Sequence, residues 1–247
     1  MSLTCDRDWR GLREVGRVVR LTLDVLERHA AAGVTTGELD HLALEIFEAH
    51  GARSAPALTY GFPGTVLISV NDEIVHGIPG MRTLRAGDVV KLDVTAEKDG
   101  YVADAARTLV LPGGTDEARR LAACAEAAFH AAAAVARAGT PVNEIGRRVE
   151  ETVTAAGFTV VRTLEGHGVG RTIHEPPRVP NWFDRRQRDV LTEGLVITIE
   201  PLITSGRGRV AQDGDGWTIR TTDGRLAAHH EHTLVITRND PVLLTAA

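Results

Sequence analysis

The segment KLDVTAEKDGYVAD, residues 91–104, carries the clearest fold signal in this sequence of 247 residues. Polar and apolar side chains alternate over residues 91–97, before Asp99-Gly100, a dipeptide that is typical of a two-residue hairpin turn. The segment therefore predicts an antiparallel pair of strands, which we expect to extend over residues 88–111. A turn at this dipeptide also determines which residues face each other across the hairpin.

Two carboxylates fall on the same face of this hairpin. The register places Thr95 opposite Asp104, and Asp93 shares the face of Thr95 because the side-chain period of a strand is 2. Asp93 and Asp104 are then diagonal neighbours with Cα atoms ~7–8 Å apart. Buried carboxylates this close repel each other and are costly to desolvate, and a divalent cation between them relieves both effects. The alternative is that these acids lie at solvent-facing strand ends.

The second half of the chain repeats this pattern. LTEGLVITIE, residues 191–200, resembles LRAGDVVKLD, residues 84–93, with an offset of 107 residues, so that Glu200 falls on Asp93. An acid at the same place in both halves suggests a site between them.

Glycines at the ends of an expected helix also recur in the second half. Gly33 and Gly51 bracket one expected helix, and glycines bracket another helix 106 residues further on. We therefore expect an α+β fold with an antiparallel sheet core and helices outside, built from two pseudo-two-fold related halves, about residues 12–111 and 115–240. Chance similarity between two helix–helix–strand units is the alternative.

Periodicity and end signals predict the remaining elements. Thr35 and Glu38 form a capping-box pattern, and Thr140-Pro141 predicts an N-cap followed by proline at the first helical position. The expected helices are residues 12–32, 36–50, 117–138 and 141–156. Further strands are expected at residues 65–70, 158–163, 195–203, 217–222 and 233–237, with loops over residues 71–80 and 166–177.

The composition excludes several classes of protein. A hydrophobic share of 43% and a charged share of 25% rule out a wholly disordered or fibrous chain. Lys plus Arg number 28 against 33 Asp plus Glu, and the net charge of −5 disfavours nucleic-acid or anionic-membrane binding. Cys5 and Cys124 are too few for a disulfide framework, and no apolar run reaches the length of a membrane span, about 18 residues. We expect a cytoplasmic protein with free thiols.

More acids and three histidines extend the candidate metal site. Glu200 ends one apolar strand, and Glu231 leads into another. His76, His167 and His174 each lie in a loop punctuated by glycine or proline, where the backbone can approach a small ligand closely. Turn histidines and solvated acids are the alternative for any one of these residues. Indirect or solvent-facing roles are expected for the histidines that flank Glu231, which are His229, His230 and His232.

Three other motif assignments fail. HEPPR, residues 174–178, lacks the second histidine of a zincin helix, and its prolines break a helix. GHGVG, residues 166–170, is not followed by a helix as a dinucleotide-binding loop would be. The sequence contains no Gly-x-Ser-x-Gly motif, and neither cysteine has an activating context.

Together these segments resemble the methionine aminopeptidases, in the short type I form of the pita-bread metallopeptidase family M24. The matching segments are SVNDEIVHGIPG (69–80), KLDVTAEKDGYVADAART (91–108), GHGVGRTIHEPPRV (166–179), GLVITIEPLI (194–203) and GWTIRTTDGRLAAHHEHTLVIT (216–237). They follow the family's order and spacing over essentially the whole chain. The resemblance implies a pita-bread fold and a single catalytic domain over residues 1–247.

The resemblance also implies a ligand set for two divalent metal ions. Asp104 and Glu231 would bridge the two ions, Asp93 would chelate one of them, and His167 and Glu200 would complete the other. An oxygen-rich site with one imidazole is compatible with Co, Mn, Fe(II) or Zn.

Further roles follow from the same resemblance. His76 and His174 match two histidines that contact the scissile amide and stabilise the tetrahedral intermediate. Glu200 is expected to relay a proton to the leaving amine. Phe62 and Trp217 match positions that line the pocket for the methionine side chain.

The activity implied is removal of the initiator methionine from nascent proteins and peptides with a small second residue, by a hydroxide that two metal ions activate. The alternatives are a proline-directed pita-bread peptidase and a non-catalytic binding module on the same fold. Leu67 stands where many relatives have cysteine and Thr59 where an aromatic residue is common, which bears on pocket shape. A monomer that acts on chains leaving the ribosome, without a nucleic-acid or membrane partner, is expected.

Overall fold

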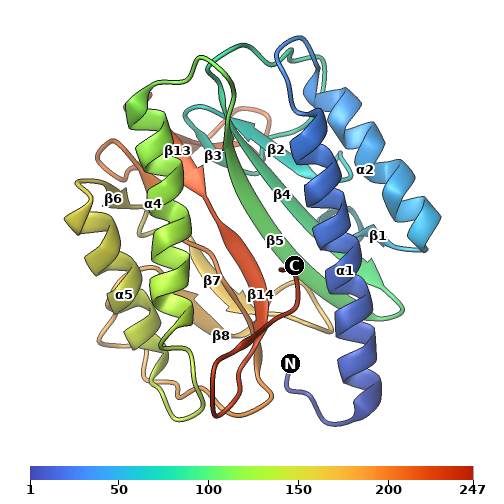
Figure 1. The fold of residues 1–247 in the computed structure, drawn as a ribbon, viewed down its shortest axis with the longest axis vertical. Coiled ribbons are helices and arrows are strands. Elements are labelled where there is room, and N and C mark those ends of the chain that lie inside the picture. Colours follow the sequence, from blue (N-terminus) through green and yellow to red (C-terminus); the bar gives the residue numbers. More distant parts are fainter. Residues whose placement is uncertain (247) are drawn as a thin grey trace.

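The computed structural model describes residues 1–246 and contains four long helices on one face of a curved antiparallel sheet (Figure 1). In Figure 1, α1 and α2 lie side by side over strands of the first half, and α4 and α5 lie side by side over the second. This arrangement confirms the predicted α+β class with helices outside. The helices are α1 (Asp6–His29), α2 (Thr36–His50), the short α3 (Ala55–Tyr60), α4 (Asp116–Ala133) and α5 (Val142–Ala155).

Nine strands form the main sheet, in the order β1-β4-β5-β14-β9-β7-β8, with β2 paired to β4 and β15 paired to β14. The pairs are antiparallel, and β5 of the first half pairs with β14 of the second, where Ala106 lies opposite Glu231. The sheet is therefore continuous between the two halves. Its strands are β1 (Arg53–Ser54), β2 (Leu67–Val70), β4 (Val89–Lys98), β5 (Tyr101–Val110), β7 (Glu165–Gly168), β8 (Glu175–Pro180), β9 (Val196–Ile199), β14 (Glu231–Val235) and β15 (Val242–Leu243).

Two three-stranded sheets flank the main one. The first has the order β13-β10-β6, and the second has the order β11-β12-β3. Because β3 belongs to the first half and β12 to the second, this second sheet also joins the halves. The strands are β3 (Glu73–Val75), β6 (Thr159–Val160), β10 (Leu202–Thr204), β11 (Val210–Gln212), β12 (Ile219–Thr221) and β13 (Ala227–His229).

The predicted hairpin is confirmed in its turn and in its register. Asp99 and Gly100 have φ angles of 52° and 79°, and both central residues of a type I′ turn require a positive φ. Thr95 lies opposite Asp104. The predicted common face of Asp93 and Asp104 follows from this pairing.

The helix-start signals had different outcomes. The capping box of α2 is confirmed, since Thr35 Oγ1 accepts from the Glu38 N–H at 3.1 Å and Glu38 Oε2 accepts from the Thr35 N–H at 2.7 Å. The predicted start of the helix after Gly139 is wrong by one residue. Pro141, in extended conformation, is the N-cap of α5 in place of Thr140.

Both stretches predicted as loops contain strands. Residues 166–177 include parts of β7 and β8, and residues 71–80 include β3. The β7 sequence EGHG shows no apolar alternation, because its glycines serve close backbone packing. A Cβ on Gly168 would lie 2.1 Å from the carbonyl oxygen of Pro176. The strand predicted at residues 195–203 is also split, into β9 and β10, at Glu200-Pro201.

Alternation along the strands separates an apolar face from a polar one. Val90, Leu92 and Val94 of β4 are fully buried in the cluster that packs against α1. Asp93 and Thr95 alternate with them and therefore point away from the helices. A second cluster packs α4 and α5 against β9 and β14. The candidate acids thus project from the sheet face opposite the four long helices.

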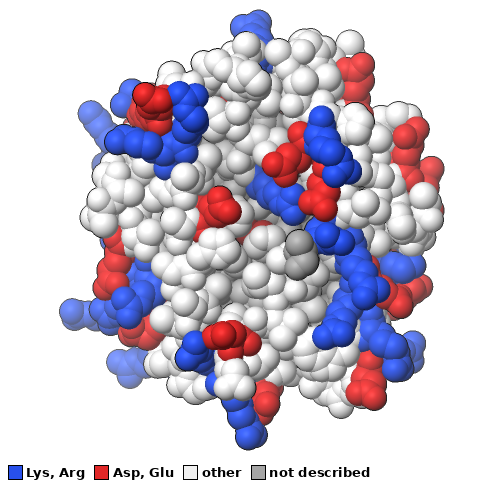
Figure 2. Space-filling view, in the orientation of Figure 1, with Lys and Arg blue, Asp and Glu red and all other residues white. Residues whose placement is uncertain are grey.

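The helix side of the molecule carries mixed charge. Figure 2 shows acidic and basic side chains interspersed on this face, among large uncharged areas. One such contact joins Arg107 of β5 to Asp24 of α1 at 2.7 Å. Within residues 1–246, the structure contains no helix that is both long and apolar enough to span a membrane.

Candidate metal centre

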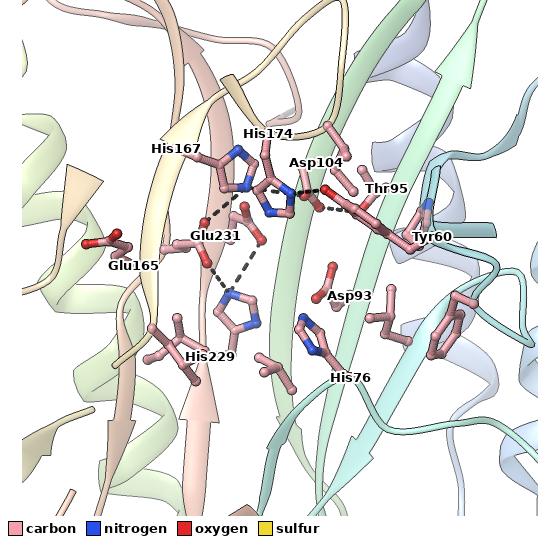
Figure 3. Close-up of a pocket in the computed structure, with 18 of the residues that line it drawn as sticks. Tyr60, His76, Asp93, Thr95, Asp104, Glu165, His167, His174, His229 and Glu231 are labelled. Atoms are coloured by element: carbon pink, nitrogen blue, oxygen red, sulfur yellow. Dashed lines mark hydrogen bonds and ion pairs between the residues drawn. The ribbon is translucent and has the colours of Figure 1, made fainter. Parts of the chain in front are cut away.

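A cavity of about 180 Å³ lies on the polar side of the sheet, lined by strands and loops of both halves (Figure 3). The first half contributes four of the candidate site residues to its lining, and the second half contributes five. The structure therefore brings together every residue that the sequence assigned to the site. These residues are Phe62, His76, Asp93, Asp104, His167, His174, Glu200, Trp217 and Glu231.

Four carboxylates gather at this cavity. Asp93 on β4, Asp104 on β5 and Glu231 on β14 come from three neighbouring strands, and Glu200 follows directly after β9. Asp104, Glu200 and Glu231 are only 6%, 9% and 2% exposed. Asp93 is half-buried. Acids are seldom buried this deeply unless a cation or a proton compensates their charge.

Two threonine hydroxyls orient two of the carboxylates. Thr95 Oγ1 donates to Asp104 Oδ1 at 2.8 Å, and Thr198 Oγ1 donates to Glu200 Oε1 at 2.7 Å. Thr198 Oγ1 also accepts from the backbone N–H of His167 at 3.1 Å. These bonds fix the direction in which the remaining carboxylate oxygens point.

His167 presents one ring nitrogen to the acids. Its Nδ1 lies 2.9 Å from the carbonyl oxygen of Gly168 and donates to it, so that Nε2 carries the lone pair. Nε2 lies 3.5 Å from Glu200 Oε1 and 4.0 Å from Asp104 Oδ2. A neutral imidazole with an oriented lone pair is the form that binds a metal ion.

Burial shifts the pKa values of the four carboxyl groups and of His167. Desolvation raises the pKa of Asp104 to about 7. It also raises the pKa values of Asp93, Glu200 and Glu231 well above their ordinary range, and repulsion from neighbouring carboxylates adds to these three shifts. Desolvation lowers the pKa of His167 to about 3, so the ring is neutral at pH 7. Bound cations would favour the ionised carboxylates at neutral pH.

The donor atoms fall into two groups, each with its atoms within 4.8 Å of one another. One group is Asp104, His167 and Glu231, and the other is Asp93, His229 and Glu231. Among residues 1–246, Asp93 Oδ1 and Glu231 Oε1 are buried without a hydrogen-bond partner. Native structures rarely leave such oxygens unpaired unless an ion or water satisfies them. The residues present therefore fit two cations that share Glu231.

Two further histidines face the cavity. The ring of His174, in the connection between β7 and β8, has its centroid 4.2 Å from that of His167. The Tyr60 hydroxyl lies 2.5 Å from His174 Nδ1, and with the phenol donating, His174 Nε2 carries the ring hydrogen. His76 follows β3 with a φ of 61°, and desolvation lowers its pKa to about 4. Both imidazoles are therefore neutral hydrogen-bonding groups beside the acids.

An apolar wall completes the cavity. Phe62 and Trp217, one from each half, pack edge to face with ring centroids 5.2 Å apart. Leu67 also lines this wall. Thr59 is exposed and lies outside the lining, whereas its neighbour Tyr60 belongs to it. The cavity therefore keeps an aromatic residue here despite threonine at position 59.

Sequence reasoning missed several contributors. His229 was expected to have an indirect role, yet it is 1% exposed and lies in the second group of donor atoms. Strand alternation could have indicated this position, since residues 229 and 231 share a face of an extended chain. The same rule places Thr198 beside Glu200. Tyr60 carried no comparable signal, because its position depends on α3, which was not predicted.

The chain is similar in sequence to known proteins over nearly its full length. The model of metallopeptidase family M24 matches residues 10–238. The chain is 41% identical over 247 residues to "Methionine aminopeptidase 2" of Bacillus subtilis (strain 168), covering 99% of each protein. It is 40% identical over 248 residues to "Methionine aminopeptidase" of Staphylococcus epidermidis, covering 99% of this chain and 98% of that protein.

Solved structures agree in fold. The crystal structure of methionine aminopeptidase from Thermotoga maritima superposes with a TM-score of 0.96 and 32% identity, and all of both chains is covered. The prolidase from Pyrococcus furiosus has a TM-score of 0.81 and 21% identity, covering 99% of this chain and 65% of that one. The second likeness extends to the fold alone.

Proposed function

The chain belongs to the methionine aminopeptidases of metallopeptidase family M24 and is a metal-dependent hydrolase, and from this premise we propose that it removes the N-terminal methionine from nascent proteins and peptides whose second residue is small. The observation that carries this proposal is the cavity that joins four carboxylates, three of them buried, and a lone-pair-bearing imidazole to an apolar wall. Hydrolysis needs the polar part, and selection of methionine needs the apolar part.

In this proposal five residues hold two divalent cations. Asp104 and Glu231 would be shared between the ions, Asp93 would serve one, and His167 and Glu200 would serve the other. When bound, the cations lower the pKa of water and polarise the substrate carbonyl. The mixed carboxylate and imidazole ligands are compatible with Co, Mn, Fe(II) or Zn.

Two histidines and one acid act on the peptide itself. His174 donates from Nε2 to the carbonyl oxygen on which negative charge develops, and a donor of this kind contributes about 10²–10³ in rate. Tyr60 keeps the required tautomer by donating to Nδ1. His76 contacts the scissile amide from the first half of the chain. Glu200, which would also bind one of the cations, relays a proton to the leaving amine.

The apolar wall selects the side chain. Phe62 is 4% exposed, and its edge-to-face contact with Trp217 leaves a surface formed by aromatic rings and Leu67. An unbranched thioether adapts to such a surface and gains favourable sulfur–aromatic contacts. We assign the methionine pocket to this wall.

The remaining expectations belong to the same proposal. We infer that residues 1–247 are one catalytic domain with half repeats at about 12–111 and 115–240, supported by the sheet that continues between the halves. We also infer a cytoplasmic monomer that acts on chains emerging from the ribosome. Cys5 and Cys124, both free thiols, are compatible with a reducing compartment.

A peptide panel tests the proposal. Protein stripped with a chelator and reloaded with Co²⁺ or Mn²⁺ should release methionine from Met-Ala-x and Met-Gly-x peptides and leave x-Pro-x peptides intact. Cleavage of only the x-Pro-x peptides would identify a proline-directed peptidase. Absence of any cleavage by a protein that binds metal would identify a binding module. Either result contradicts the proposed activity.

A further inference from the structure

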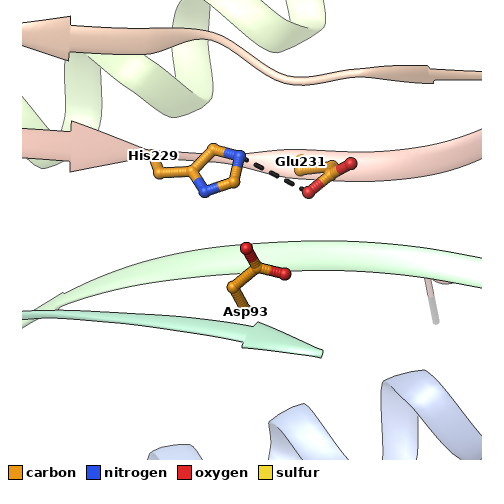
Figure 4. A group of neighbouring side chains, drawn as sticks. All are labelled: Asp93, His229 and Glu231. Carbon is orange, nitrogen blue, oxygen red and sulfur yellow. Dashed lines mark ion pairs between the residues drawn. The ribbon is translucent and has the colours of Figure 1, made fainter. Parts of the chain in front are cut away.

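His229 is buried at the metal centre and faces two of its carboxylates. It ends β13, two residues before Glu231, and is 1% exposed. Its Nε2 lies 3.4 Å from Glu231 Oε2 and 4.0 Å from Glu200 Oε2. Figure 4 shows the ring beside Glu231 on one stretch of chain, with Asp93 facing both from another strand. An imidazole here is therefore enclosed by acids from both halves.

Neither ring nitrogen of His229 has a hydrogen-bond partner among residues 1–246. A buried polar group left without a partner destabilises the fold. The Asp93 Oδ1 and Glu231 Oε1 atoms are unpaired in the same way. One ligand atom each of Asp93, His229 and Glu231 lies within 4.8 Å of the others, without a hydrogen bond between them. A cation held by these atoms would compensate the buried carboxylates and give one His229 nitrogen a partner.

The distances fit direct coordination. Two donor atoms that are each about 2.1 Å from one ion and 3.4 Å from each other subtend an angle of about 110° at the ion, close to tetrahedral. A separation of 3.4 Å is also at the long end for a hydrogen bond. His229 Nε2 and Glu231 Oε2 are therefore spaced as two ligands of one cation.

We propose that His229 Nε2 is a direct ligand of the cation held by Asp93 and Glu231. This inference rests on the two-cation site of the proposed function and adds a sixth residue to it. Each cation then has one imidazole, His167 on one and His229 on the other. A second imidazole shifts the preference of the site away from Mg²⁺ and Ca²⁺ and toward Fe²⁺, Co²⁺, Ni²⁺ or Zn²⁺.

The competing role is that of a positioning residue that hydrogen-bonds Glu231 without touching the metal. His229→Gln separates the two roles, because a glutamine amide can still donate to Glu231 but cannot act as an imidazole ligand. His230→Gln is the matched control. It makes the same change one residue away, on a ring that packs against Phe129 at 5.4 Å between centroids.

The test uses the full chain loaded with two equivalents of Co²⁺. X-ray absorption at the cobalt edge should count an average of one imidazole per cobalt in the wild type and in His230→Gln, and about half that in His229→Gln. Calorimetric titration should show one of the two Co²⁺ equivalents weakened at least about 10-fold in His229→Gln. The number of imidazoles per cobalt in the wild type needs no variant, so it tests the inference even if His229→Gln fails to fold.

Two results overturn the inference. A wild-type average of half an imidazole per cobalt would leave His167 as the single nitrogen ligand. An unchanged count and unchanged affinities in His229→Gln would assign His229 the positioning role. In both cases wild-type release of methionine would keep the proposed function standing, whereas a wild-type protein that binds no Co²⁺ would remove both.

Discussion

Helices α2 and α5 occupy corresponding places in the two halves of the chain, 106 residues apart, but their neighbours are held in different ways. Asp40 of α2 accepts the backbone N–H groups of Thr65 and Val66 at 2.7 and 2.9 Å. The corresponding residue of α5 is Gly146, where a Cβ would lie 2.1 Å from the carbonyl oxygen of Trp182. In the first half a carboxylate ties residues 65–66 to the helix, and in the second half residues 180–182 pack directly on the helix backbone.

The candidate metal ligands also differ between the halves in their backbone setting. The first half places Asp93 and Asp104 on two regular ten-residue strands, β4 and β5. The second half places His167 at a register shift in β7 and Glu200 where the chain breaks between β9 and β10. In the first half the candidate ligands therefore project from regular strands. In the second half, irregular backbone directs His167 and Glu200 toward them.

The largest effect should come from the two carboxylates, one in each half, that the proposed function shares between both cations. Asp104→Asn in the first half and Glu231→Gln in the second should each reduce kcat/KM for a Met-Ala-x peptide by about 10³-fold or more, because each removes a charge shared by both cations. Metal content measured by elemental analysis should fall in both variants. Full activity and full metal content in either one would show that the two halves do not share the ions.

Proton binding gives the next largest effect. Because burial raises the pKa of Asp104 from 3.8 to about 7, the folded metal-free protein holds a proton between about pH 4 and pH 7 that the unfolded chain has lost. That contribution is fully present below about pH 4 and is lost as the pH rises toward 7. Asparagine has no such proton to lose.

The free energy of unfolding of metal-free wild type, minus that of metal-free Asp104→Asn, should therefore fall by about 2–4 kcal/mol between pH 4 and pH 7. Denaturant titrations of both proteins at several pH values measure this difference. Saturating Co²⁺ should increase the difference in unfolding free energy at pH 7 in favour of the wild type, since the ion stabilises the wild type more than the variant. A difference that is flat in pH would mean that Asp104 is ionised without metal.

The two helix contacts provide a smaller test. Gly146→Ala should lower the free energy of unfolding by about 2–3 kcal/mol, because the added methyl meets backbone oxygens that cannot rotate away. Asp40→Asn should cost about 1–2 kcal/mol, since the amide keeps one acceptor and loses the charge. Urea unfolding measures both, with exposed Glu151→Ala on α5 as a control. If Asp40→Asn lowered the free energy of unfolding as much as Gly146→Ala or more, the expected difference between the two helix contacts would be wrong.

The smallest effect distinguishes the helix starts. Thr35→Ala should cost about 1 kcal/mol, because it removes the capping box of α2. Thr140→Ala should change stability by less than about 0.5 kcal/mol, since Pro141 is the N-cap of α5 and no side chain caps that helix. Thermal unfolding of the two variants side by side measures the contrast. A comparable loss at Thr140 would contradict the observed α5 start.

The regular elements α2, β4 and β5 are also those that the sequence predicts well. The hairpin register follows from Asp99-Gly100 and strand alternation, and the α2 start follows from Thr35 and Glu38, because these signals are local. β7 and β8 are not predictable in this way. Their glycines and prolines serve contacts with distant segments, as in the approach of Pro176 to Gly168.

The candidate site shows the same limit. Local patterns indicated the acids, since each abuts a strong strand. The pairing of β5 with β14, which sets Glu231 beside the hairpin, depends on contacts 125 residues apart, between Ala106 and Glu231. His229 was undervalued because three histidines surround Glu231, and composition alone cannot show which face each one takes. Only the strand pairing separates them.

The division of ligands between the halves has a practical consequence. Pro112 and Gly113 form an exposed turn between β5 and α4. Cutting the chain there would leave Asp93 and Asp104 on one fragment and Glu231 on the other, each with an open strand edge that only its counterpart completes. The two fragments would form a split enzyme, inactive when separate and active when associated. Its turnover would therefore report association of the fragments.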